Sequence, residues 1–142
     1  LALPDRHEAF FDKVGDVKMV GVLGFHYKFA DYETDQQYLF KNYNLYTVHS
    51  EFLVIESVLS QRAQIGIVST TMLDYMKLTK PEEYEKLLVS DRYDTEYEYA
   101  YVVAGHSPIT AKGLNGFLKL LGESGELGRI FARYGLNAEF CQ

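Results

Sequence analysis

The hydrophobic pattern of residues 17–77 predicts three strands that alternate with helices. The expected strands are short, largely apolar runs over residues 17–23, 44–48 and 64–68. Between and after these runs, apolar side chains recur three and four residues apart, which is typical of helices that bury one face. These helices are expected over residues 31–43, 51–59 and 70–77. The alternation favours a parallel sheet with right-handed crossovers, and therefore an α/β fold.

Smaller elements are predicted on either side of this region. Residues 4–13 and 81–86 each have the length and composition of a short helix, and residues 87–90 those of a brief strand. Tyrosines alternate with glutamates over residues 95–104, a period of two that predicts a further strand.

Two consecutive helices are predicted near the end of the chain. Apolar positions at helical spacing cover residues 114–121 and 127–134. Gly125 separates the two segments, and Gly135 is expected to cap the second. Glycine is favoured at such ends because it adopts left-handed backbone angles at little cost.

Three hydroxyl side chains stand together where the third strand becomes a helix. Serine and threonine commonly begin helices, because their oxygens accept a hydrogen bond from a free amide of the first turn. Ser50 is expected to cap the second helix in this way, and Thr70 or Thr71 to cap the third. Capping alone is therefore one explanation of the Ser69–Thr71 cluster, and contact with a ligand is the other.

The strand–helix junctions are the expected ligand site. In open parallel sheets, ligands bind beyond the carboxyl ends of the strands, where helix amino termini favour polar or anionic groups. The junction over residues 24–29 is rich in aromatic rings, which also line many ligand pockets, although packing alone would explain them too. We expect ligand contacts from Gly24, Phe25, His26, Tyr27, His49, Ser50, Ser69, Thr70 and Thr71.

Motifs that would indicate catalysis or a cofactor do not occur in the sequence. A metal site at His26 and His49 would need a third ligand, for which Glu51 is the nearest choice, and hydrogen bonding explains both histidines more simply. A Ser69–His49 pair would suit a hydrolase, yet no nucleophile motif surrounds Ser69, and no phosphate-binding glycine loop is present. We therefore expect that the protein is not an enzyme and has no catalytic residues, no metal and no cofactor.

Composition excludes several classes of partner. The net charge is −6 and the Lys and Arg residues are scattered, which argues against nucleic acid and against an anionic membrane surface. No apolar run approaches the roughly 20 residues of a membrane span, so direct membrane insertion is not expected. The single Cys141 cannot form an internal disulfide.

Four segments, taken in order, resemble a known family. They read DVKMVGVLGFHYKF, VLSQRAQIGIVSTTMLDYM, YEYAYVVAGHSPIT and GFLKLLGESGELGRIFARYGL. Their order and spacing are similar to the second lobe and C-terminal section of bacterial extracytoplasmic solute-binding proteins of the polar-amino-acid type. The resemblance covers residues 14–136.

The resemblance implies a three-layer αβα lobe with a mainly parallel sheet, as in type 2 periplasmic-binding proteins, followed by two C-terminal helices. Residues 1–104 would form this lobe, and residues 105–142 would pack on a first lobe that is absent from this chain. It also implies a periplasmic location and hinge closure on a small polar or aromatic solute. The implied partners are that solute, an ABC permease, and either the missing first lobe or a second copy of this chain.

Two positions differ from the family pattern. Phe25-His26 stands where amino-acid binders carry Gly-Thr, and Ser69 where they carry the aspartate that binds the α-ammonium. The resemblance therefore favours a larger, aromatic or anionic solute over an ordinary α-amino acid. A ligand-sensing domain of a membrane receptor, an enzyme on a related lobe and a purely structural α/β module are the alternatives.

Overall fold

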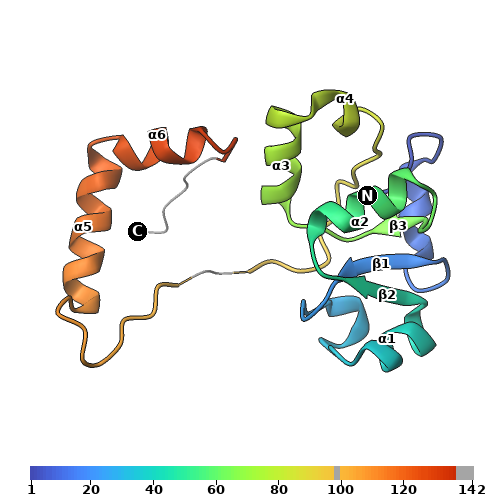
Figure 1. Cartoon of the computed structure of the whole chain (residues 1–142), viewed down its shortest axis with the longest axis horizontal. Helices are drawn as coiled ribbons and strands as arrows, with labels where there is room; N and C mark the ends of the chain where they lie inside the picture. The colour runs from blue at the N-terminus through green and yellow to red at the C-terminus, as the bar shows by residue number, and fades with distance from the viewer. Residues whose placement is uncertain (98–99, 137–142) are drawn as a thin grey trace. The chain divides into compact units, whose positions relative to one another are not determined.

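The computed structural model describes residues 1–97 and 100–136 (Figure 1). The chain divides into two compact units, Leu1–Glu96 and Tyr97–Gln142. The boundary predicted between residues 104 and 105 falls inside the second unit. We describe each unit by itself.

A small parallel sheet forms the centre of the first unit. Its strands are β1 (Met19–Val22), β2 (Leu45–Val48) and β3 (Ile65–Gly66), arranged in the order β2-β1-β3 (Figure 1). Both pairs of neighbouring strands are parallel, with Met19 opposite Leu45 on one side and Ile65 on the other. The predicted α/β class and the parallel sheet are therefore confirmed.

Helices follow the strands as predicted, with shifted ends. The α-helices of this unit are α1 (Gln36–Tyr43), α2 (Glu51–Leu59), α3 (Thr70–Thr79) and α4 (Pro81–Tyr84). Helix α1 begins five residues later than expected, because Asp31 and Tyr32 have positive φ angles of 52° and 62°. The side chain of Asp35 caps it by accepting the Tyr38 amide at 2.7 Å. Two 3₁₀ helices, η1 (Glu8–Lys13) and η2 (Lys28–Ala30), complete the unit.

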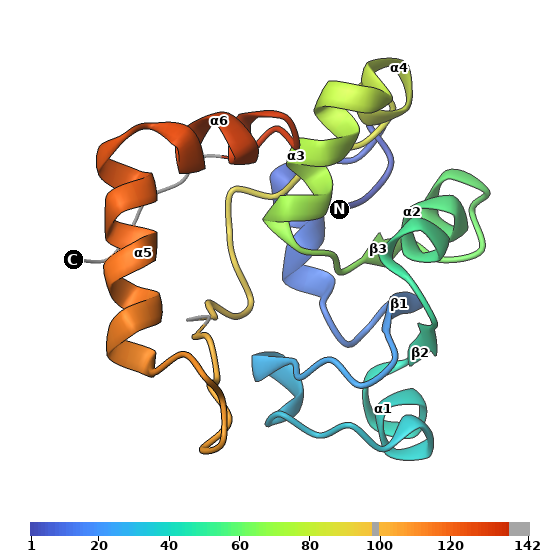
Figure 2. The ribbon, with the colours of Figure 1, turned by 60° about the vertical axis from the view of Figure 1, so that its left-hand side comes forward.

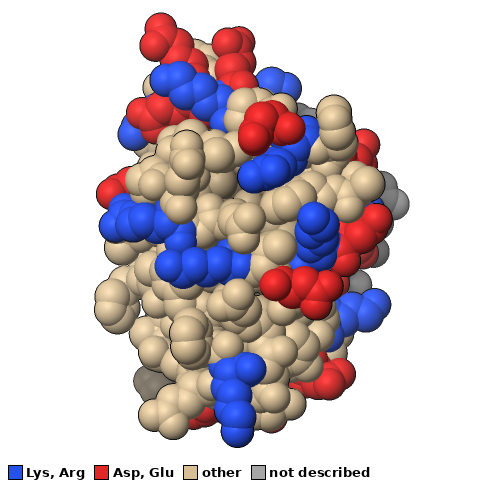
Figure 3. Space-filling model, turned by 90° about the vertical axis from the view of Figure 1, so that its right-hand side faces the viewer, with Lys and Arg blue, Asp and Glu red and all other residues tan. Residues whose placement is uncertain are grey.

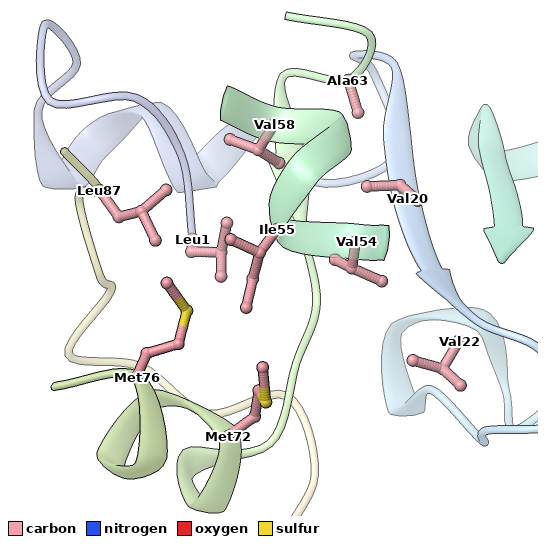
Figure 4. Packing of buried hydrophobic residues seen from close by; sticks show 10 residues of the cluster. All are labelled: Leu1, Val20, Val22, Val54, Ile55, Val58, Ala63, Met72, Met76 and Leu87. Carbon is pink, nitrogen blue, oxygen red and sulfur yellow. The ribbon is translucent and has the colours of Figure 1, made fainter. Parts of the chain in front are cut away.

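Apolar side chains are buried on both faces of the sheet. On one face, Val20 and Val22 pack with Val54 and Val58 of α2 and with the methionines of α3 (Figure 4). On the other face, alternate positions of the strands pack with η1 and α1; Figure 2 shows α2 and η1 on opposite sides of the strands. The cluster on this second face consists of Ala2, Phe11, Met19, Tyr27, Ala30, Leu39, Leu45 and Ile65.

The first two residues extend the sheet beyond β3. The Leu1 amine donates to the Gly66 carbonyl at 2.7 Å, and the Leu1 carbonyl accepts from the Gly66 amide at 2.9 Å. Ala2 in turn forms an isolated antiparallel bridge with Leu88. The strand predicted over residues 87–90 is thus reduced to this single bridge, because only Leu88 reaches a partner.

The second unit contains α5 (Ala111–Glu123) and α6 (Glu126–Ala132), joined by a sharp bend (Figures 1 and 2). Both helices were predicted, and Gly125 between them adopts the expected left-handed angle, with φ of 73°. The strand predicted over residues 95–104 is wrong for residues 95–97 and 100–104, which form no ladder; residues 98–99 lie outside the described part of the chain.

Candidate functional site

The carboxyl ends of the strands meet at one edge of the sheet, which we call the rim. It comprises the three junctions that follow β1, β2 and β3. The Leu23 amide, just after β1, donates to the Val48 carbonyl at the end of β2 at 2.8 Å. The Ser69 amide, before α3, donates to Glu51 Oε1 at the start of α2 at 2.5 Å. Hydrogen bonds therefore join each of these junctions to a neighbour.

The hydroxyl groups at the rim have different roles. Ser50 caps α2 by accepting the Leu53 amide at 3.4 Å, as predicted. Ser69, and not Thr70 or Thr71, caps α3, because its Oγ accepts the Met72 amide at 3.1 Å. The cap of α3 predicted at Thr70 or Thr71 was therefore wrong, because it lies one or two residues earlier, at Ser69.

Six predicted ligand-binding residues at the rim are exposed, and the capping serines are half-buried. Thr70 and Thr71 lie in the first turn of α3, so both threonine side chains are accessible from solvent. His49 lies between β2 and its helix, where it is also exposed. Gly24, with φ of 81°, turns the chain out of β1, and Phe25 beyond it is 39% exposed, close to exposed His26.

Tyr27 does not belong to the exposed rim. Its ring is 2% exposed and lies in the core, and its hydroxyl oxygen accepts the Val22 amide at 2.7 Å and lies 3.1 Å from the Val22 carbonyl. Gly21 makes room for this ring, since a Cβ there would lie 2.7 Å from the Cζ atom of Tyr27. The tyrosine therefore holds the aromatic loop against β1, which is the packing alternative considered for this loop.

Asp94 fixes the same loop from the other end of the first unit. Its carboxylate accepts the Lys28 amide at 2.8 Å and the Phe29 amide at 3.0 Å. The Thr95 hydroxyl supports it by donating to Asp94 Oδ2 at 2.8 Å. The contacts of Asp94 with the Lys28 and Phe29 amides span more than 60 residues of sequence, and the local pattern gave no signal of them.

Glu51 is the rim residue that the sequence analysis did not assign to the ligand site. It is half-buried, and its carboxylate spans two strand–helix junctions. The ion pairs among residues 1–97 and 100–136 do not include it. A glutamate in the first turn of a helix is ordinarily explained by the helix dipole, so its long-range contact was not predictable from the local sequence.

Basic and acidic side chains share the face of the molecule drawn in Figure 3. Lys and Arg side chains extend across the middle of this face, and acidic side chains lie beside some of them. Arg92, for example, contacts Asp12 at 2.8 Å and Glu8 at 3.3 Å, and the hydrogen bond that its guanidinium donates to Asp12 raises the pKa of the guanidinium.

Shallow hollows lie beside α2 in the first unit. One shallow hollow is lined by residues of α1, β2 and α2, including Phe40 and Tyr46, and another lies between α2, α3 and α4. Among the described residues, no group of three or more His, Cys, Asp or Glu side chains is arranged to hold a metal ion. The rim is thus an open edge with polar groups and one partly exposed ring.

Comparison of the chain with protein-family models, with curated proteins and with solved structures gives no significant match. Within residues 1–97 and 100–136, no helix combines the length and the apolar character needed to cross a membrane.

Proposed function

We propose that the rim binds a small polar or aromatic solute, and that the first unit acts as one lobe of a two-lobed solute-binding protein. One observation carries the proposal. The hydrogen bond between the Ser69 amide and Glu51 gathers the starts of α2 and α3, with their hydroxyls, at the edge where ligands bind parallel α/β sheets. The resemblance to type 2 periplasmic-binding proteins supports the same function.

The proposed mechanism is closure of a second lobe over a solute held at the rim. The exposed part of the Phe25 ring offers a stacking surface, while Thr70 and Thr71 offer hydroxyls that donate and accept. An open edge gives few contacts alone, so most of the affinity would come from contacts made only in the closed state. Delivery to an ABC permease in the periplasm is the biological role that this mechanism would serve.

The second lobe would be a first lobe from another chain or a second copy of this one. The exposed apolar side chains of α5 and α6 support such a partner, since Phe117 is 57% exposed and Leu120 is 62% exposed. Sedimentation equilibrium separates the two choices. A second copy gives the mass of a dimer, whereas a persistent monomer leaves the separate first lobe as the partner.

A thermal-shift screen of small metabolites tests the proposed function. A solute that binds only the folded protein at 100 times its dissociation constant adds about 2.7 kcal/mol to the unfolding free energy. We expect polar or aromatic solutes to raise the melting temperature of the 142-residue protein. If no solute raised the melting temperature, either of this chain alone or of this chain mixed with a first lobe, the result would contradict solute binding.

A matched pair of phenylalanine variants locates the binding surface. Phe25→Ala removes the ring at the rim, whereas Phe40→Ala removes an exposed ring of α1. We expect the first variant to weaken a solute found in the screen by roughly tenfold, equivalent to about 1.4 kcal/mol, and the second to leave it unchanged. Equal effects of the two variants would place the solute elsewhere.

A further inference from the structure

Strand β2 is an outer strand of the sheet, with β1 as its one neighbour in the described part of the chain (Figure 1). The Leu23 amide donates to the Val48 carbonyl at 2.8 Å, so the backbone of Val48 faces β1. Backbone groups alternate between the two sides of a strand, so those of Tyr46 also face β1, whereas those of Leu45 and Thr47 point outward. No hydrogen bond among the described residues involves these outward groups. The outer side of β2 therefore offers donors and acceptors to a further strand.

One of the two shallow hollows lies along this outer side, and we call it the β2 hollow. It has a volume of about 380 Å³ and is lined by Lys18, Phe40, Tyr46, Val48, Ser57 and Arg62. Phe40 belongs to α1 and Ser57 to α2, and these helices pack on opposite faces of the sheet. A hollow that both helices line therefore crosses the outer side of β2. A strand added there would place alternate side chains beside those of Tyr46 and Val48.

The lining of the β2 hollow combines aromatic rings with positive charge. Phe40 is 57% exposed, and the Lys18 ammonium lies 5.4 Å from the centre of the half-buried Tyr46 ring. Arg62 donates to Glu56 through Nη2 at 2.7 Å, while its Nη1 makes no hydrogen bond with the described residues. The described lining residues include no carboxylate. The lining therefore favours a partner that brings an apolar side chain together with a negative one.

We infer that the outer side of β2 binds an extended segment of another protein, in which an apolar side chain and an acidic one stand two positions apart. The backbone of the segment would bond to Leu45 and Thr47 and extend the sheet by one strand. Its apolar side chain would contact the Phe40 and Tyr46 rings, and its carboxylate would lie near Lys18.

This binding surface is separate from the proposed solute site. Lys18 directly precedes β1, and Arg62 precedes β3 by three residues. Both cations therefore stand at the amino ends of the strands, whereas the rim lies at their carboxyl ends. The inference goes beyond the proposed function and does not depend on it.

A second copy of this chain fits the β2 hollow less well than an acidic segment does. Its own outer strand, Leu45–Val48, carries no acidic residue. Pairing of two β2 strands side by side would satisfy the outward backbone groups, but it would bring no carboxylate from β2 to the cations of either hollow. Charge complementarity therefore favours a different polypeptide.

The heptapeptide acetyl-TETFTET-amide tests the inference. As a strand it places a phenylalanine between two glutamates on one face, and its sequence reads the same in both directions. Its binding to the full 142-residue chain is measured from ¹H–¹⁵N spectra. We expect the amides of Leu45 and Thr47 to shift and to exchange more slowly with solvent, because the added strand accepts hydrogen bonds from them. The amides of Ser69 and Thr70 at the rim should stay unchanged.

Two matched peptides separate charge from spacing. Acetyl-TKTFTKT-amide carries lysines in place of the glutamates, and we expect it to bind at least tenfold more weakly. Acetyl-TTEFETT-amide has the composition of the first peptide, but in a strand its glutamates lie on the face opposite the ring. We expect it to bind about fivefold more weakly than acetyl-TETFTET-amide.

A matched pair of lysine variants locates the charge contact. Lys18→Gln removes a cation of the β2 hollow, and Lys77→Gln removes an exposed cation of α3. Both side chains are exposed, so both variants should keep the fold. We expect Lys18→Gln to weaken acetyl-TETFTET-amide by about threefold to fivefold, in the range of an exposed ion pair, and Lys77→Gln to have no effect.

Four results would overturn the inference: no shift of the Leu45 and Thr47 amides, equal affinities for the acidic and basic peptides, equal affinities for the two glutamate spacings, or equal effects of the two lysine variants. A shift of the same amides on raising the protein concentration without peptide would assign the outer side of β2 to a second copy and would also overturn it. Each of these results leaves solute binding at the rim untouched, because the thermal-shift screen tests that function separately.

Discussion

The two units of the chain use apolar residues in opposite ways. In Leu1–Glu96, the strands and helices bury two clusters, one on each face of the sheet. In the described part of Tyr97–Gln142, Leu127 alone among the apolar side chains is buried. Larger apolar side chains such as that of Phe117 are exposed. The hydrophobic pattern of α5 is as regular as that of α2, so periodicity alone does not indicate whether a face is covered.

The largest difference is expected from matched leucine variants. Leu45→Ala empties a fully buried position of β2, which should cost about 2–5 kcal/mol through lost burial and a residual cavity. Leu120→Ala shortens a side chain of α5 that is 62% exposed and should change stability by less than about 0.5 kcal/mol. Urea unfolding followed by circular dichroism measures both. Similar losses would mean that the second unit also has a packed core.

A smaller, pH-dependent difference is expected from the Leu1 amine. Burial lowers the pKa of this amine from 8.0 to about 5 in the folded state. Between these values the unfolded chain holds a proton that the folded chain lacks, so stability should rise with pH from about 5 to 8. The slope should reach at most about 1.4 kcal/mol per pH unit.

Blocking the amine gives the control for this pH dependence. A preparation that begins at Leu1 is compared with one in which an added residue turns the amine into an amide, and the histidines are the same in both. The slope of unfolding free energy against pH should be flatter in the extended chain. Identical slopes would show that the Leu1 amine is solvated in the folded state.

Another difference concerns two glycines with opposite surroundings. Gly21→Ala should cost about 1–3 kcal/mol, because its Cβ would lie 2.7 Å from Tyr27 Cζ. Gly116→Ala in α5 meets no atom within 4 Å and should stabilise that helix by up to about 1 kcal/mol. Thermal unfolding of both variants measures the signs. A stabilising Gly21→Ala would mean that the Tyr27 ring moves aside freely.

The order of elements was predictable from the sequence because each strand–helix pair has its own local pattern. Helix ends were less predictable, as at α1, where two residues with positive φ delay the start to Gln36. The alternation at residues 95–104 failed in the described part because a strand also needs a neighbour to bind, and spacing within one segment cannot supply that.

For the candidate site, the sequence predicted which edge of the sheet it occupies but not the contacts within it. The position of the junctions at one edge follows from the parallel order of the strands, and Phe25 and His49 are exposed there. The burial of Tyr27 depends on Gly21 having no side chain, and the contact of Glu51 with Ser69 crosses 18 positions. Both depend on tertiary packing, which neither periodicity nor residue type reveals.

The contact between Ala2 and Leu88 has a consequence for protein engineering. Their amides donate to each other's carbonyls at 2.9 and 2.7 Å, so two stretches near opposite ends of the first unit lie side by side. Adjacent entry and exit points are what insertion into a host protein or circular permutation requires. A host protein carrying the first unit in a surface loop would therefore need only short connecting peptides.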